Sequence, residues 1–341
     1  MKKLGIIDKI IFFVNSLVAF ALLLSYLLPY VPPKTFPLLS VLSLGVPLLI
    51  ILNLLFMVFW AIRFKRQLLL SLIVLLIGYN HVFSLFQFSG NSAEMNEDSL
   101  SVMSYNVRMF NAYKWVNVKN IPEKITDLVT EKDPDILATQ EHYVGVSELI
   151  KNYPYSYIFL KEKNAEFGSA IFSKYPIIKK HSVGFPENGN NNAIFVDIVK
   201  NKDTLRIFNV HFQSLNIKPG IRDLKDADSK KLIGRIGYGF KLQQKQAEMM
   251  MKEVDKSPYK TLVIGDFNNT AFSYIYKQVK GSRFNDAFLE EGSGFGKTFN
   301  LSYFPLRIDF LMIDKSIKIE TFEVYPVNYS DHFPIMSRIK W

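Results

Sequence analysis

The chain has 341 residues, no cysteine and a formal net charge of +10. This length exceeds one ordinary hydrophobic core, and the lack of cysteine excludes disulfides, thiol catalysis and cysteine metal sites. Residues 1–92 hold seven Lys or Arg and one acidic residue, so they contribute +6 and the rest of the chain only +4. The charge therefore does not by itself indicate a nucleic-acid-binding protein, although +4 is compatible with an anionic substrate.

Three long apolar runs, at about residues 10–31, 36–62 and 67–88, dominate the first part of the chain. Each can cross a bilayer, which needs about 20 apolar residues. Asp8 is the only acidic residue of 1–92, and three such runs are hard to bury in a soluble domain. We expect a membrane anchor of three transmembrane helices, with buried core helices as the alternative. The first run is longer than that of a cleaved signal peptide, so we expect it to be retained.

The flanks of these runs predict an orientation. Their basic residues cluster before the first run and between the second and third: Lys2, Lys3 and Lys9, then Arg63, Lys65 and Arg66, with only Lys34 between the first two. By the positive-inside rule the N-terminus is cytoplasmic. We expect a multi-pass protein of the inner (cytoplasmic) membrane, a polar linker at 93–98, and a catalytic domain at 99–341 that is periplasmic or extracellular.

Residues 99–341 alternate short β-rich runs with helical stretches. Helical spacing occurs at 122–132, 239–255 and 270–279. The β-rich runs lie at 100–107, 135–140, 155–160, 169–173, 193–199, 204–212, 261–267, 307–313 and 333–339. The pattern predicts an α/β domain in which two sheets pack face to face with helices outside.

Polar residues stand where several of these apolar runs end. They are Asn106, Glu141, His211, Asp266, Asn268, Asp309, Asp331 and His332. Carboxylates, amides and imidazoles gathered at strand ends are what a metal-assisted attack on a phosphate ester requires. Each has an ordinary alternative when taken alone: a turn, a solvated surface carboxylate, a structural histidine, or an Asx turn that caps a helix starting at Thr270.

Asp309 is the hardest of these residues to explain as ordinary structure. It lies inside the apolar run RIDFLMI, where a carboxylate is costly unless another group pairs with it. His332, in NYSDHFPI, is the natural partner. An Asp that accepts a hydrogen bond from an imidazole fixes its tautomer and raises its basicity, an arrangement that activates a nucleophilic water.

Together these motifs resemble the endonuclease/exonuclease/phosphatase superfamily, the deoxyribonuclease-like metal phosphodiesterases. The resemblance covers about residues 99–341 and rests on segments in this order: SYNVR, PDILATQE, GSAIFSKYPI, NVHFQS, GDFNNT, RIDFLMI and SDHFPI. It implies a four-layer α/β/β/α sandwich. It also implies that Glu141 is the principal metal ligand, that Asn106 holds metal or phosphate beside it, and that Asp331 helps the metal site. The implied ion is Mg²⁺, with Mn²⁺ as the alternative, acting as a Lewis acid.

The same resemblance assigns catalytic roles. His332, oriented by Asp309, would be the general base, and Asp266 would orient the attacking water or bind metal. Asn268 would bind the phosphate, and His211 would stabilise it or protonate the leaving oxygen. The context of His211 is more similar to the deoxyribonuclease, sphingomyelinase and inositol-phosphatase branches than to the abasic-site repair branch. The pancreatic-type nucleases give this histidine an acidic partner, for which Glu166 lies near the right region.

The substrate stays open between a lipid phosphate, favoured by tethering to a bilayer, and extracytoplasmic nucleic acid. The longest expected loop, 215–240, mixes basic and acidic residues and is either a solvated loop or a gate for an anionic group. The sequence implies no protein partner. A noncatalytic binding module on the same fold is the alternative to an enzyme, and a transporter fragment is disfavoured because the apolar runs lack internal charges.

Overall fold

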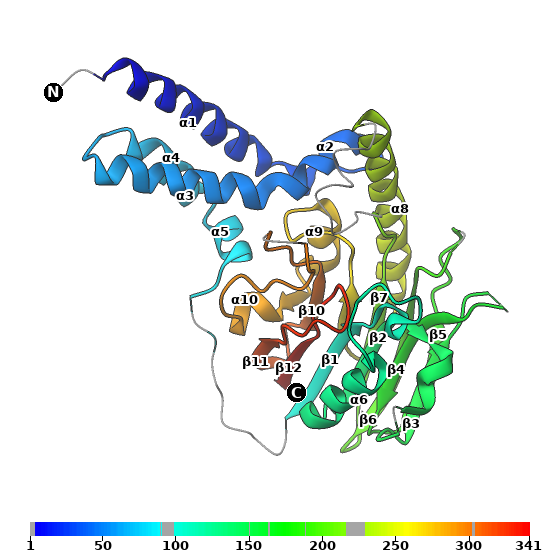
Figure 1. Ribbon diagram of the computed structural model, residues 1–341. Coiled ribbons are helices and arrows are strands. Elements are labelled where there is room, and N and C mark those ends of the chain that lie inside the picture. Colours follow the sequence, from blue (N-terminus) through cyan, green and yellow to red (C-terminus); the bar gives the residue numbers. More distant parts are fainter. Residues whose placement is uncertain are drawn as a thin grey trace.

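The computed structural model describes residues 4–88, 90, 99–149, 151–162, 164–187, 189–215, 229–301 and 304–341. A helical part precedes an α/β domain, and the helices project away from one side of that domain (Figure 1). The expected linker at 93–98 lies outside the described residues.

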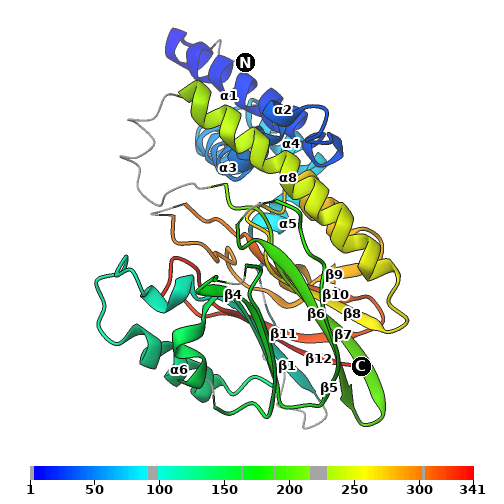
Figure 2. The ribbon, with the colours of Figure 1, turned by 90° about the vertical axis from the view of Figure 1, so that its right-hand side faces the viewer.

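The α/β domain contains two six-stranded sheets, seen nearly edge-on in Figure 2. The first has the order β11 (Lys318–Val324), β12 (Ile335–Lys340), β1 (Leu100–Asn106), β2 (Ile136–Tyr143), β4 (Phe167–Ser173), β3 (Tyr155–Phe159). The second has the order β5 (Ile177–Ser182), β6 (Asn192–Lys200), β7 (Asp203–His211), β8 (Lys260–Asp266), β10 (Asp309–Asp314), β9 (Phe284–Asp286).

Alternation along the strands directs one set of apolar side chains into the space between the sheets. There Val102 and Ile136 of the first sheet belong to one buried cluster with Val196, Ile207 and Ile264 of the second.

Helices cover the outer face of each sheet. α6 (Ile121–Lys132) packs on the first sheet, and α8 (Ser229–Asp255) and α9 (Tyr274–Lys280) pack on the second. A short α10 (Ala287–Glu291) lies against β11. This mixed α/β fold with two packed sheets is consistent with the expected sandwich.

Each of the nine β-rich runs contains a strand, but three strands were not predicted. β5 reads IIKKHS and is largely exposed, β9 has only three residues, and β11 alternates charged and apolar residues at a sheet edge. Short or polar edge strands carry little of the apolar signal on which the prediction relied.

Two helix boundaries also differ from expectation. α8 begins at Ser229 rather than 239, so 229–240 of the expected loop is helical, while 216–228 lies outside the described residues. The sequence did not predict this part of the helix because it contains three glycines, which have low helical propensity: Gly234, Gly237 and Gly239. α9 begins after Ser273, whose side chain accepts from the Tyr276 amide, so the expected start at Thr270 was too early.

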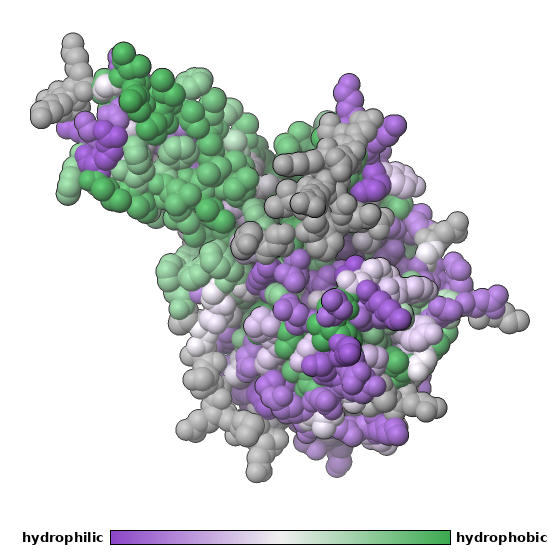
Figure 3. Space-filling view, viewed as in Figure 1, coloured by the Kyte–Doolittle hydropathy of each residue, from purple (hydrophilic) through white to green (hydrophobic). Residues whose placement is uncertain are grey.

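The helical part consists of α1 (Ile6–Ser25), η1 (Leu28–Tyr30), α2 (Pro37–Val41), η2 (Leu42–Gly45), α3 (Val46–Ile62), α4 (Leu68–Ile77) and α5 (Tyr79–Leu85). Its surface is largely apolar, in contrast with the hydrophilic α/β domain (Figure 3).

Two stretches of this part, Ile6–Tyr30 and Pro37–Ile62, are long and apolar enough to cross a membrane. The third expected span differs from the first two. The third run bends by 82° between α4 and α5 and adds a crossing only if that pair forms one span. The bend falls at Gly78, where a Cβ would lie 2.0 Å from the ring of Tyr26.

The helical part is docked on the α/β domain. α2 lies beside α8 (Figure 1), and the Lys34 amide donates to Gln244 Oε1 at 2.8 Å. The Lys277 ammonium lies 3.9 Å from the centre of the Tyr30 ring. The two parts therefore share an interface as well as a chain.

Gly265 in β8 provides a test of strand packing next to Asp266. Its φ is +136°, and an added Cβ would lie 2.1 Å from the carbonyl oxygen of Val210 on β7. We expect Gly265→Ala to lower stability by at least about 3 kcal/mol, because both the backbone conformation and the space exclude it. Thermal unfolding of the detergent-solubilised full-length chain measures this.

Gly234→Ala is the matched control. Gly234 is exposed within α8 with nothing within 4 Å of an added Cβ, so the same substitution should stabilise the chain by about 0.5–1 kcal/mol. Equal melting temperatures for Gly265→Ala and the parent would contradict the packing described for β7 and β8.

Candidate active site

The ends of strands from both sheets meet at one edge of the sandwich. In the second sheet, Asp266 of β8 is in register with His211 of β7 on one side and Asp309 of β10 on the other. In the first sheet, Asn106 ends β1 beside β2, which carries Glu141. Strand pairing therefore brings together side chains that are far apart in the sequence.

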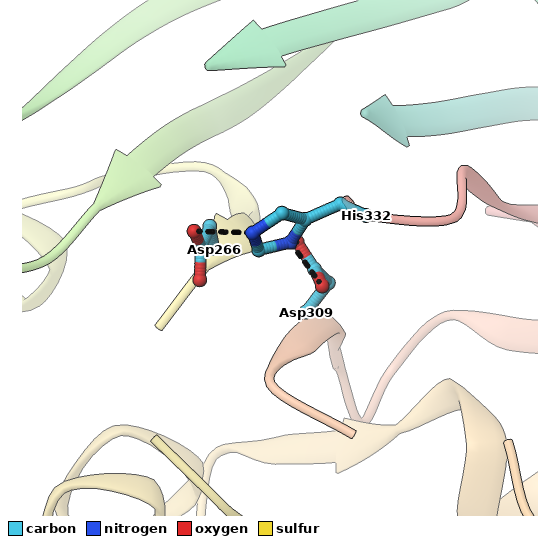
Figure 4. Close-up of side chains that lie close together, drawn as sticks. All are labelled: Asp266, Asp309 and His332. Carbon is cyan, nitrogen blue, oxygen red and sulfur yellow. Dashed lines mark hydrogen bonds and ion pairs between the residues drawn. The ribbon is translucent and has the colours of Figure 1, made fainter. Parts of the chain in front are cut away.

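His332 and Asp309 form the expected pair (Figure 4). The Nδ1 atom of His332 lies 3.0 Å from Asp309 Oδ2 and 3.2 Å from Oδ1. Both side chains are buried, and Thr298 Oγ1 accepts from the Asp309 amide at 3.1 Å. With Nδ1–H donating to the carboxylate, Nε2 is left as the basic nitrogen, and it faces Asp266 Oδ2 at 3.7 Å.

Asp266 is the centre of the polar cluster. It accepts from Asn106 Nδ2 at 3.0 Å and from the Asn268 amide at 2.7 Å. Asn106 Nδ2 also lies 3.5 Å from Glu141 Oε1, so one amide bridges the two carboxylates and the two sheets. Glu141 has a φ of +52°, a left-handed conformation that places this side chain at a break in the pairing of β2 with β4.

His211 also lies in this cluster. Its Nε2 atom is 3.7 Å from Asp266 Oδ2 and 3.8 Å from Glu141 Oε1. The acidic neighbours of His211 are therefore Asp266 and Glu141. Glu166, the candidate partner from the sequence, instead accepts from the Tyr113 hydroxyl at 3.3 Å.

Asp331 is tied to Arg108, whose Nη1 lies 3.2 Å from its Oδ2. Its neighbour Ser330 donates to the Asn106 carbonyl at 2.8 Å and accepts from the His332 amide. Ser330 thus holds the segment carrying His332 against the end of β1, a role that its sequence context did not reveal. In the sequence, a serine before Asp-His is typical of an ordinary turn, and its hydrogen bond to Asn106 at the end of β1 depends on the fold.

A cavity of about 110 Å³ opens over this cluster. Five of the eight predicted residues line it: Glu141, Asp266, Asn268, Asp331 and His332. The other three, Asn106, His211 and Asp309, are buried and contact the lining carboxylates or the imidazole of His332. The structure therefore brings all eight together.

The sequence did not reveal other parts of the site. Gln140 Nε2 donates to Asn209 Oδ1 at 2.7 Å, and Asn209 Nδ2 donates to the carbonyls of Thr139 and Ala170, which links the sheets below the cavity. Leu44 of the helical part lines the cavity. Neither feature has a local sequence signal, because both depend on contacts between distant elements.

The electrostatics of the cluster are unfavourable without a compensating charge. Burial raises the pKa of Asp266 to about 6, and burial together with Asp331 raises the pKa of Glu141. Burial alone would lower the pKa of His332, but the carboxylates of Asp309 and Asp266 outweigh it and raise the value to about 10. Burial lowers the pKa of His211. Buried carboxylates this close are costly unless cations offset them.

A divalent cation fits this donor set. Glu141, Asp266 and Asp331 line the cavity, and carboxylate and amide oxygens are the ligands that Mg²⁺ and Mn²⁺ prefer. The ligand atoms of Asp266, Asp309 and His332 also lie within 4.8 Å of one another. Because the Asp309–His332 hydrogen bond already engages two of these three residues, we favour an ion on the Glu141 side of Asp266.

The environment of His142, which follows Glu141 in β2, predicts that the fold loses stability at acidic pH. It is buried between Phe110 and Phe172, and burial lowers its pKa to about 4. An unfolded histidine has a pKa near about 6.5, so the unfolded chain binds the proton first, and stability falls as the pH drops below that value. From pH 7 to pH 5 we expect this residue to account for a loss of about 2 kcal/mol.

The His142→Phe variant tests this prediction by denaturant unfolding at both pH values. Its stability should fall by less than that of the parent over the same interval. Parallel declines for variant and parent would mean that His142 is not held neutral by the fold.

Comparisons with known proteins identify the family of the α/β domain. Residues 103–332 match the model of the Endonuclease/Exonuclease/phosphatase family, and residues 8–85 match a domain of unknown function, DUF8431. No curated protein matches the chain.

Solved structures share the fold of the α/β domain. A conserved protein of unknown function from Enterococcus faecalis has 17% identity and a TM-score of 0.54, over 70% of this chain and 99% of that one. TDP2 from D. rerio, complexed with a single-strand DNA product, has 15% identity and a TM-score of 0.54, over 72% and 100%. A mannosyl-6-phosphatase from Bacteroides thetaiotaomicron has 18% identity and a TM-score of 0.51, over 71% and 100%.

Proposed function

The chain belongs to the endonuclease/exonuclease/phosphatase family of metal-dependent phosphoesterases, and on that premise we propose that it is a membrane-tethered hydrolase in which an activated water attacks a phosphate ester. One observation carries this proposal. His332, which is hydrogen-bonded to the buried Asp309, lines the same cavity as the carboxylates of Glu141 and Asp266. A base and an oxygen-rich cation site in one cavity are the two parts that such a reaction needs.

His332 is the residue placed to take the proton from water. Its Nδ1–H donates to Asp309, which fixes the tautomer and leaves Nε2 toward the cavity. With a pKa of about 10, however, His332 holds a proton at neutral pH and cannot act as a base. When bound, the ion would offset the carboxylate charges, bring that pKa toward neutrality, and act as a Lewis acid on the phosphoryl oxygens.

We assign the ion to Glu141, with Asn106 and Asp331 beside it, and we expect Mg²⁺ with Mn²⁺ as the alternative. Asp266 is positioned between Asn106 and His332 to orient the attacking water.

His211 and Asn268 would act on the phosphate and the leaving group. His211 is buried next to Asp266 and Glu141; burial lowers its pKa, and the carboxylates of Asp266 and Asp309 partly oppose that effect. We assign it to stabilising the phosphate or protonating the leaving oxygen. Asn268 lines the cavity and donates through Nδ2 to Asp266 and to the Phe212 carbonyl. Its assignment to phosphate binding rests on the family resemblance and on its place in the cavity lining.

The helical part supports the proposed tether. Asn15, inside the first apolar helix, is buried against other helices, where it donates to Ser71 at 2.7 Å and accepts from Trp60 at 3.0 Å. Polar groups satisfied between helices are the arrangement expected within a bilayer. Asp8 at one end of α1 pairs with Arg63 at the end of α3, while Tyr30, beyond the other end of α1, contacts the α/β domain.

The charged pair at one end of the helices and the contact with the α/β domain at the other favour placing the N-terminus on one side of the membrane and the catalytic domain on the other. With the basic residues that flank the spans, it favours a cytoplasmic N-terminus in the inner membrane and a periplasmic or extracellular catalytic domain. We expect a fluorescent reporter that matures only in the cytoplasm to be dark when fused after Trp341. A periplasm-active phosphatase reporter at the same point should be active.

The same two reporters fused after Phe64, between the second and third runs, are the control and should give the opposite pattern. A bright cytoplasmic reporter after Trp341 would contradict the proposed topology. If the Phe64 fusions still gave the expected pattern, the bent α4–α5 pair would have to return to the side from which it started; if they changed as well, the whole orientation would be reversed.

A lipid phosphate is the substrate that we favour, because the cavity lies next to the helical part. Nucleic acid is the second candidate, and one observation favours it. Tyr113 and Trp115 are exposed aromatic residues in contact with each other, and the Arg108 guanidinium lies 4.7 Å from the Trp115 ring. In single-strand-binding sites, exposed aromatic rings and arginine side chains stack on the bases. Arg108 also forms an ion pair with Asp331, which lines the cavity.

An assay of the full-length chain in detergent tests the proposed activity. We expect Mg²⁺-dependent hydrolysis of a bis-aryl phosphodiester, sphingomyelin, a phosphatidylinositol phosphate or plasmid DNA, lost on chelation and restored by Mg²⁺ or Mn²⁺. His332→Ala should lower kcat about 10²–10⁴-fold because the general base is removed. Glu141→Gln should raise the metal concentration needed for half-maximal activity.

His181→Ala is the matched control, because His181 is exposed on the edge strand β5. It should behave as the parent. Undiminished hydrolysis by His332→Ala would overturn the catalytic assignment. A preference for plasmid DNA that Trp115→Ala weakens would favour the second candidate substrate.

A further inference from the structure

One side chain that lines the catalytic cavity comes from the helical part. Leu44 lies in η2, directly before α3, yet it lines the cavity together with Glu141, Asp266 and His332. We propose that Leu44 forms part of an apolar wall of the active site, and that this wall binds the hydrocarbon portion of a phosphate ester that reaches the site from the bilayer. The proposal rests on the proposed hydrolase function and deepens it.

The contact between the segment Val41–Gly45 and the α/β domain is extensive. Val41 and Leu44 pack against the buried cluster that contains Leu215, Ile236 and Phe240. Thr270 Oγ1 donates to the Ser43 carbonyl at 3.5 Å, and Lys34 forms an ion pair with Glu248 of α8. Because several independent contacts hold the segment, Leu44 is a fixed part of the cavity.

Two chemically different sets of side chains line the cavity. The polar set comprises the carboxylates of Glu141, Asp266 and Asp331 and the imidazole of His332, with Ser214 and Asn268. The apolar lining consists of Leu44, Leu215, Phe299, Leu306 and Ile308. Phe299, Leu306 and Ile308 form a small cluster of their own, and the Phe299 ring packs edge-on to His332 at 5.0 Å between centres.

This arrangement indicates the kind of substrate. A phosphate group bound by the polar set would have its ester substituent against apolar side chains, so the substituent gains from being apolar itself. A sugar or nucleoside would bury its hydroxyl groups against leucine, isoleucine and phenylalanine without hydrogen-bond partners, at a cost.

The path from the membrane is short. Leu44 precedes the first residue of α3, Val46, by two positions, and α3 belongs to a stretch apolar enough to span a bilayer. Leu42, in the same turn as Leu44, is exposed with a relative accessibility of 57%. A lipid at the surface next to α3 is therefore close to the cavity, which favours a bilayer phosphate ester over a soluble one as the occupant.

The test compares two synthetic substrates that differ only in one alkyl group, octyl p-nitrophenyl phosphate and methyl p-nitrophenyl phosphate. For the full-length chain in detergent with Mg²⁺, we expect kcat/KM to be higher for the octyl ester. Leu44→Ser should lower the octyl-to-methyl ratio about tenfold or more, the size expected when an apolar pocket loses a few methylene contacts. Leu42→Ser, the matched control, should keep the ratio of the parent.

A second measurement does not depend on a polar substitution in the interface. Because the chain has no cysteine, Leu44→Cys and Leu42→Cys each carry a single thiol. A negatively charged methanethiosulfonate reagent should modify both variants, with mass spectrometry as the readout. Modification of the Leu44→Cys variant should lower hydrolysis of the octyl ester at least tenfold, whereas modification of the Leu42→Cys variant should leave it unchanged.

The outcomes separate the two proposals. An octyl-to-methyl ratio that Leu44→Ser leaves unchanged, full activity after complete modification of Leu44→Cys, or a thiol in that variant that never reacts would overturn the apolar-wall proposal. In each case chelator-sensitive hydrolysis that depends on His332 would leave the proposed function standing. Conversely, hydrolysis that neither chelation nor His332→Ala reduces would reject the proposed function itself.

Discussion

The crowding of negative charge around one buried imidazole is the constraint on which the site depends. Asp266 and Asp309 lie on either side of His332, and Glu141 shares an amide hydrogen-bond partner with Asp266. Burial raises the pKa of Asp266 to about 6, and the carboxylates of Asp309 and Asp266 outweigh the effect of burial on His332 and raise its pKa to about 10, which is too high for a base at neutral pH. Buried carboxylates this close together cost stability, and on the proposed function a divalent cation would offset that cost and bring the pKa of His332 toward neutrality.

The helical part contributes to this site as well as preceding it in the chain. Leu44 reaches the cavity because the helices are docked on α8 and α9, with Lys34 against Gln244 and Tyr30 against Lys277. On the proposed function, such a hydrolase has its polar catalytic groups in a hydrophilic domain and its apolar cavity wall next to the bilayer. That arrangement would connect where the protein is anchored to what it hydrolyses.

The sequence predicted much of the fold and which side chains lie together at the cavity, for identifiable reasons. Strands such as β8 and β10 carry strong apolar signals, and Asp309 stood out because a carboxylate inside such a strand requires a partner. The edge strands β5 and β11 and the glycine-rich start of α8 lacked that signal. The bend at Gly78 depends on Tyr26, and the role of Leu44 depends on docking between distant segments, so neither can be deduced locally.

Direct binding of a metal ion tests the central claim most plainly. Titration of Mn²⁺ into the full-length chain, followed by the loss of the free-ion signal in electron paramagnetic resonance, measures occupancy without any substrate. We predict saturable binding that Mg²⁺ competes away and that Glu141→Gln weakens about tenfold or more, as expected for loss of a ligand. Undetectable binding, or equal affinity in the parent and Glu141→Gln, would contradict the claim that these carboxylates exist to hold a cation.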